Sequence, residues 1–154
     1  RFEPCLRSHF MNKSKVIIMM GLPASGKSTI AKTEYSEYIR INQDELGSRD
    51  KCVEFFELNL TLDNDIIVDR CNVTKKQRKI WLDICRKHGI MDITSVWVKT
   101  DLDECKRRIL SRLDHPTITN KMSDGKKISI INKFMESLEP PDSREGFSKL
   151  EEKI

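Results

Sequence analysis

The sequence predicts one α/β domain, in which a parallel sheet of four to five strands lies between two layers of helices. Short apolar runs alternate with longer amphipathic segments, and the first run leads directly into a glycine-rich loop. Alternation of strands and helices is typical of a parallel sheet that is covered on both faces. The length of 154 residues suits a single domain. We expect this domain to span residues 15–154, with residues 1–14 as an N-terminal extension or as the remnant of an upstream region.

Hydrophobic periodicity gives the elements in order. Short apolar runs predict strands at residues 15–20, 38–41, 65–68 and 93–98. Apolar side chains recur at helical spacing between them, over residues 52–60 and 80–88. A further helix at 101–112 opens with an acidic first turn, which suits the helix dipole. Beyond it we expect a break at 123–125, a helix at 128–138, a loop at 139–145 and a last short strand at 146–150.

Composition excludes several classes of protein. Hydrophobic residues make up 38% of the chain, which is enough for a core and excludes a disordered tail or a coiled coil. The longest apolar run, residues 16–22, is shorter than the ~20 residues of a membrane-spanning helix. The five cysteines are odd in number and never closer than 14 positions, so neither a disulfide framework nor zinc-ligand pairs fit. Reduced thiols in an intracellular compartment, nucleus or cytoplasm, are the expectation.

The positive charge is concentrated in one part of the chain. The formal net charge is +4, but residues 75–133 carry 15 basic and 7 acidic side chains, a net of +8. The basic residues cluster at 75–79, 106–108 and 126–127. Such a stripe attracts phosphates, although solvated helix faces would explain it as well.

The loop at residues 21–29, Gly-Leu-Pro-Ala-Ser-Gly-Lys-Ser-Thr, fits the phosphate-binding pattern of P-loop NTPases. Glycines let consecutive backbone N–H groups face an anion at the start of a helix. We expect Lys27 to reach the β- and γ-phosphates and the Ser28 hydroxyl to hold Mg²⁺. The predicted nucleotide-binding residues are Gly21, Ala24, Ser25, Gly26, Lys27, Ser28 and Thr29.

This loop does not by itself define the reaction, because GTPases, motor ATPases and small kinases share it. The chain has no Asn-Lys-x-Asp motif for reading guanine, and it is too short for a large ATPase. Its size therefore favours a small phosphotransferase.

Acidic side chains follow two of the predicted strands, at the sheet edge where parallel sheets bind ligands. Asp44 follows the second strand and is a candidate general base, although Asp44 or Asn42 would equally serve as a helix cap. Asp69 follows the third strand, where a buried carboxylate suggests a role with Mg²⁺, its water shell or an acceptor-binding arginine. Asn72 is expected to cap the next helix with Gln77 nearby.

Two arginines, Arg108 and Arg112, lie four apart on one predicted helix face. The loop that follows, residues 114–125, is a candidate helical lid, whose closure would bring both guanidinium groups onto the transferring phosphate. Two solvated arginines are the alternative.

Together these segments resemble the kinase domain of the polynucleotide kinase family, within the zeta-toxin and adenylate-kinase-like group of P-loop kinases. The matching elements are the glycine loop, Asn42-x-Asp44, Asp69-x-x-Asn72, Arg108-x-x-x-Arg112 and residues 145–147. Members often have Arg at the position of Gln43 and Thr at that of Cys71, and some have an acceptor-binding arginine at that of Gly47. Here Arg49 or Lys51 is a possible substitute.

The resemblance implies a 5′-hydroxyl kinase that uses ATP, or another nucleoside triphosphate, and Mg²⁺. Asp44 would be the general base, and Lys27, Arg108 and Arg112 would be catalytic, with Arg112 also contacting the nucleotide. Ser28 and Asp69 would serve the metal, while Asp44, Asp69, Arg70, Asn72 and Arg49 would bind the acceptor.

The implied partner is the 5′-hydroxyl end of DNA or RNA, single-stranded at the site, bound by a monomer that works with another repair domain. Two other functions remain open. One is a P-loop kinase of a small hydroxyl compound or nucleotide, and the other is a nucleotide-binding module that no longer catalyses.

Overall fold

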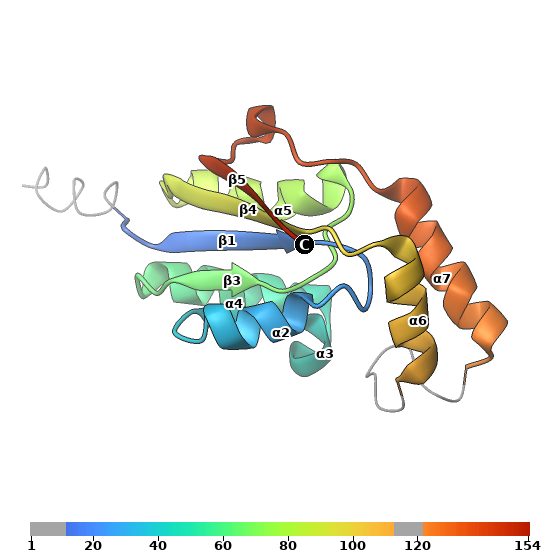
Figure 1. Cartoon of the computed structure of the whole chain (residues 1–154). Coiled ribbons are helices and arrows are strands. Elements are labelled where there is room, and N and C mark those ends of the chain that lie inside the picture. The colour runs from blue at the N-terminus through green and yellow to red at the C-terminus, as the bar shows by residue number, and fades with distance from the viewer. Residues whose placement is uncertain (1–11, 113–121) are drawn as a thin grey trace, which may run out of the picture.

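The computed structural model describes residues 12–112 and 122–154 of the chain. Its five strands are β1 (Lys15–Met20), β2 (Ile39–Ile41), β3 (Ile66–Val68), β4 (Asp92–Val98) and β5 (Lys149–Lys153). All pairings are parallel, in the order β2-β3-β1-β4-β5, which confirms the predicted sheet. β1 lies at the centre, so the glycine loop leaves the sheet between two neighbouring strands (Figure 1).

The helical elements of the described residues are α2 (Lys27–Glu34), α3 (Gln43–Leu46), α4 (Arg49–Thr61), α5 (Lys75–Lys87), α6 (Leu102–Ser111), α7 (Asp124–Ser137) and the 3-10 helix η1 (Ser143–Glu145). α4 and α5 cover one face of the sheet and α2 covers the other. α6 and α7 pack together beyond the carboxyl ends of the strands (Figure 1). No helix among these is long and apolar enough to cross a membrane.

The alternation of side chains along β1 explains why both faces of the sheet are covered. Val16 and Ile18 pack into the core beneath α4 and α5, whereas Ile17 and Met19 pack beneath α2. All four side chains are buried. A strand that is buried on both faces must be apolar throughout, and this requirement produces the short unbroken run seen in the sequence.

Two helices begin at different residues from those predicted. Thr74 and not Asn72 is the N-cap of α5, because its hydroxyl accepts from the Gln77 N–H and the Gln77 side chain accepts from the Thr74 N–H. This reciprocal capping box satisfies two backbone donors at once. The predicted break at 123–125 is also wrong, since the Ser123 hydroxyl caps α7 and the helix begins at Asp124.

The last strand begins three residues later than predicted. Gly146 ends η1 with a φ of 119°, a left-handed conformation that favours glycine. Phe147 is buried in the core beneath α4 and α5, and the Ser148 hydroxyl accepts from the Ile93 N–H and donates to the Ile93 carbonyl. These residues anchor the chain before β5 begins at Lys149.

The cysteines in the described part of the chain, Cys52, Cys71, Cys85 and Cys105, are free thiols. Burial raises the pKa of Cys85 to about 12 and raises those of Cys52 and Cys105. These three thiols therefore stay protonated at neutral pH and behave as small apolar side chains.

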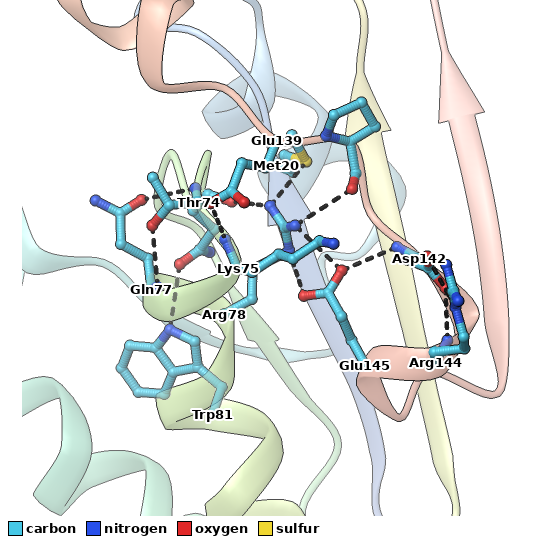
Figure 2. A network of polar contacts seen from close by, with 12 residues as sticks. Met20, Thr74, Lys75, Gln77, Arg78, Trp81, Glu139, Asp142, Arg144 and Glu145 are labelled. Atoms are coloured by element: carbon cyan, nitrogen blue, oxygen red, sulfur yellow. Dashed lines mark hydrogen bonds and ion pairs between the residues drawn. The ribbon is translucent and has the colours of Figure 1, made fainter.

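Arg78, which the sequence placed in a basic stripe, is fully buried and forms an internal ion pair. Its Nε and Nη2 atoms donate to the two carboxylate oxygens of Glu145 at 3.0 and 3.1 Å, and Nη1 donates to the Asn72 carbonyl at 2.9 Å (Figure 2). A further link joins the Lys75 N–H to a carboxylate oxygen of Glu139 at 3.1 Å. Arg78 therefore fastens the segment between α7 and β5 to the start of α5.

Replacing Glu145 by Ala should lower the free energy of unfolding by about 3–5 kcal/mol, because it leaves the buried Arg78 charge without its partner. Asp83→Ala is the matched control in α5, since Asp83 forms exposed pairs with Lys79 and Arg86. Its cost should stay below about 1 kcal/mol. Urea denaturation measures the free energy of unfolding of both variants. Equal decreases in the two variants would contradict the assigned role of Arg78.

Candidate active site

The loop between β1 and α2 has the geometry of a phosphate-binding loop. Gly26, with a φ of 104°, precedes α2, and Ala24 also adopts a positive φ of 65°. A Cβ atom on Gly21 would lie 2.8 Å from the Val98 carbonyl oxygen and 2.9 Å from the Ser25 hydroxyl. Only glycine fits at position 21, and the loop therefore turns sharply as it leaves β1.

The Lys27 ammonium group lies against the loop that precedes it. Its Nζ donates to the carbonyls of Leu22 at 2.7 Å and Gly21 at 3.1 Å, and to the Ser25 hydroxyl at 3.3 Å. The residue is buried. A positive charge is therefore fixed inside the loop, where an anion would be surrounded by backbone N–H groups and the start of α2.

Ser28 and Asp69 form the oxygen-ligand pair that the sequence predicted for a metal. The Ser28 hydroxyl donates to Asp69 Oδ2 at 2.9 Å, although the two residues are 41 positions apart. Mg²⁺ in kinase sites takes one or two protein oxygens and completes its shell with water and phosphate oxygens. This hydroxyl and carboxylate fit that pattern.

Arg40 is a site residue that the sequence analysis missed. Its Nε donates to Asp69 Oδ2 at 2.7 Å and its Nη2 lies 2.6 Å from the same oxygen, while Nη1 pairs with Glu45. Arg40 stands in β2 between two isoleucines, where a charged side chain needs a partner. That partner follows β3, the neighbouring strand, and only the pairing of the two strands brings the ion pair together.

The second strand leads directly into the short helix α3, which carries Asp44. Asn42 is the N-cap of this helix, because its Oδ1 accepts from the Glu45 N–H. Of the two capping residues left open by the sequence, the structure thus selects Asn42. Asp44 lies exposed in the first turn and lines the same cavity as the phosphate loop.

Arg70 lines the same cavity as Asp44. Its guanidinium carbon lies 5.9 Å from the centre of the Trp81 ring, which allows a cation–π contact. Burial lowers the pKa of Arg70, while the nearby charges of Asp44 and Arg49 act in opposite directions. A guanidinium group remains protonated at neutral pH, so Arg70 gives a positive charge to the cavity that Asp44 also lines.

Both polar atoms of the Asn72 side-chain amide form hydrogen bonds within the fold. Its Nδ2 donates to the Met19 carbonyl at 2.8 Å, and its Oδ1 accepts from the Trp81 indole N–H at 3.2 Å. Its backbone has a φ of 46°, which asparagine tolerates better than most residues. Asn72 therefore fixes the shape of the chain after β3, whatever it contributes to an acceptor.

A cavity of about 370 Å³ joins these groups. It brings together most of the predicted site residues, namely Ala24, Ser25, Gly26, Lys27, Ser28, Thr29, Asp44, Asp69, Arg70, Asn72 and Arg112. Gly21, Arg49 and Arg108 do not line it. The opposite wall is apolar and comes from Met122, Ile130 and Phe134, which the sequence analysis did not assign to the site. Their spacing is that of any packed helix face, so the sequence gives no signal that they face a cavity.

The two predicted lid arginines occupy different positions. Arg108 Nη1 donates to the Ala24 carbonyl at 3.3 Å, and its Nε donates to Glu104 at 2.7 Å. Hydrogen bonds from Arg107 and Arg108 lower the pKa of Glu104 to about 2, so this carboxylate remains charged. Arg108 thus supports the phosphate loop from outside, while Arg112 lines the cavity at the end of α6. Residues 114–121 of the predicted lid lie outside the described residues.

The fold and this site define a P-loop domain of the kinase type. The chain belongs to the family described as "AAA domain", whose model matches residues 16–141. The bifunctional polynucleotide phosphatase/kinase of Schizosaccharomyces pombe is 28% identical over 142 residues, which cover 90% of this chain and 33% of that protein. The chain thus spans about a third of the length of this relative. The resemblance to polynucleotide kinases drawn from the motifs is confirmed.

Solved structures confirm the three-layer fold. A fungal RNA kinase has a TM-score of 0.67 at 15% identity, with coverage of 91% of this chain and 74% of that chain. A gluconokinase from Sinorhizobium meliloti 1021 has a TM-score of 0.59 at 18% identity, with coverage of 90% and 81% respectively. At such identities the likeness establishes the fold and leaves the acceptor open.

Gly21→Ala should weaken nucleotide binding at least about tenfold, because the new methyl group would collide with a backbone carbonyl and displace the loop. Gly125→Ala is the control, since a Cβ atom there meets nothing within 4 Å. Titration with a fluorescent ATP analogue measures both variants. A Gly21→Ala protein that binds as tightly as the control would contradict the steric argument.

Proposed function

We propose that this domain transfers the γ-phosphate of ATP, or of another nucleoside triphosphate, to the 5′-hydroxyl end of DNA or RNA. The observation that carries the proposal is that Asp44, Arg70 and the phosphate loop line one cavity. The polynucleotide phosphatase/kinase of S. pombe supports this acceptor class. That relative is three times as long, and we propose that this domain likewise works beside another repair domain.

In the proposed reaction, the oxygen of the 5′-hydroxyl group attacks the γ-phosphorus, and Asp44 accepts the proton of that hydroxyl group. The bond between that phosphorus and the bridging oxygen breaks, and the nucleoside diphosphate leaves. Lys27, the N–H groups of the loop and Arg112 balance the negative charge that moves during transfer. Ser28 and Asp69 would hold Mg²⁺, which when bound neutralises phosphate charge. Arg70 is suited to an acceptor phosphate near the hydroxyl group.

A small hydroxyl compound is the second candidate acceptor. The cavity volume of about 370 Å³ lies in the range of small-molecule sites, so the cavity alone would accept a compact substrate. The two acceptors differ in charge, because a strand carries a phosphate for each nucleotide beyond the first.

Transfer of labelled phosphate to 5′-hydroxyl acceptors of one, three, six and twelve nucleotides, DNA and RNA, tests the proposal. We expect kcat/KM to rise with length and then level off. With three or four phosphate contacts, its log–log dependence on salt should have a slope of about −2 to −3. A response that is flat in length and salt would instead indicate the small-molecule kinase. Nucleotide binding without transfer to any acceptor would indicate a non-catalytic module.

Asp44→Asn should lower kcat by about 10²-fold or more and leave nucleotide affinity nearly unchanged, because the amide keeps the shape but cannot accept the proton. Asp63→Asn is the control, since Asp63 is exposed after α4 and has a positive φ that asparagine adopts readily. Steady-state kinetics and nucleotide titration give the two quantities. A parallel loss of nucleotide affinity would remove Asp44 from the role of base.

A further inference from the structure

The guanidinium group of Arg40 joins two carboxylates that belong to different parts of the site. Nε and Nη2 contact Asp69 Oδ2 at 2.7 and 2.6 Å, and Nη1 contacts Glu45 in α3. Three nitrogens of one rigid planar group are thereby used. The Arg40 side chain is 16% exposed and that of Asp69 is 2% exposed, so their contact is largely shielded from water.

The helix on the Glu45 side of this link has little packing of its own. α3 is four residues long and contains no buried residue, and only Leu46 packs against the core in part. Its position therefore depends on polar links. Asn42 supplies one, because it caps α3 and its Nδ2 donates to the Asp69 carbonyl at 3.2 Å. Arg40 supplies another, through its contact with Glu45.

We infer that Arg40 is a positioning residue that holds the carboxylate of Asp69 and the helix bearing Asp44 in one unit. Glu45, which Arg40 contacts, is the neighbour of Asp44 in the chain. Asp69 also accepts from the Ser28 hydroxyl at 2.9 Å, so the unit reaches the first turn of α2. This inference rests on the proposed phosphoryl transfer, in which a displacement of about 1 Å between reacting groups costs on the order of 10²-fold in rate.

Arg40 also affects the charge that a metal ion would meet. The Arg40–Asp69 pair has a net charge of zero, which weakens the attraction of Asp69 for a divalent cation. Loss of the guanidinium charge should therefore tighten Mg²⁺ binding while it slows transfer. A residue that merely stabilised the fold would weaken both when removed.

Three substitutions separate the two effects. Arg40→Gln should lower kcat about 10- to 100-fold and lower the Mg²⁺ concentration for half-saturation about 3- to 10-fold. Arg40→Lys keeps the positive charge but cannot contact both carboxylates with one planar group, so kcat should fall. The Mg²⁺ concentration for half-saturation should stay within twofold of wild type. Glu45→Gln removes only the α3 side of the link and should behave like Arg40→Lys. Arg86→Gln, at an exposed ion pair of α5, is the control.

The Mg²⁺ dependence is measured by binding of the non-hydrolysable analogue AMPPNP at a series of Mg²⁺ concentrations. Hydrogen exchange of residues 43–47 reports the position of α3, and it should accelerate in Arg40→Gln and in Glu45→Gln. A double variant that combines Arg40→Gln with Glu45→Gln should transfer phosphate no more slowly than Arg40→Gln alone, because both changes remove the same contact between residues 40 and 45.

Additive losses in the double variant would overturn the inference. So would an Arg40→Gln protein whose Mg²⁺ affinity, nucleotide affinity and melting temperature fall together. Failure of the proposed function is a separate result. A wild-type protein that phosphorylates no polynucleotide would refute the acceptor assignment, while AMPPNP binding and hydrogen exchange would still decide the role of Arg40.

Discussion

A carboxylate that is almost fully buried must have its charge met inside the protein, and the candidate site is arranged around this requirement at Asp69. Arg40 approaches it from β2, Ser28 from the first turn of α2 and Asn42 from the start of α3. These elements follow one another in the chain, whereas Asp69 lies 27 to 41 positions after the residues that contact it. The need to solvate one carboxylate thus brings the phosphate loop and the helix of Asp44 to fixed positions.

A second arginine, Arg78, performs a similar task at the start of α5, and it is fully buried. Arg78 holds Glu145 and the carbonyl of Asn72, and Asn72 in turn holds Met19 and Trp81 through its amide. The chain that carries Arg70 and Cys71 is thereby fixed between the end of β3 and the start of α5. The segment after α7 closes over this region from outside (Figure 2). The polar side of the cavity therefore relies on ion pairs inside the protein, whereas the wall from Met122, Ile130 and Phe134 is apolar.

The parts of the site that the sequence predicted are those encoded within a few neighbouring residues. The glycine loop is such a motif, because its backbone geometry requires glycines at fixed spacing. Asp44 and Asp69 could also be predicted, since each directly follows a strand and parallel strands end at one edge. The polynucleotide kinase resemblance rested on these same positions.

The parts that escaped prediction depend on contacts between distant segments. Arg40 looks like a solvated charge in a short strand until β2 pairs with β3 and places Asp69 beside it. Arg78 lies among four other polar residues at 75–79, and its burial follows only from Glu145, 67 positions away. The starts of α5 and α7 differ from the prediction for a local reason, since several residues near each start can cap a helix.

The two ends of the cavity differ in how they are built, and this difference bears on specificity. On the phosphate side, Lys27, Ser25 and Asp69 are buried and hydrogen-bonded, so their geometry is fixed before any ligand arrives. At the other end, Asp44 is exposed and stands in the short helix α3. Exposed side chains can change with little cost to the fold, whereas the buried set cannot. A fungal RNA kinase and a gluconokinase share this fold, so the fold by itself is compatible with more than one acceptor.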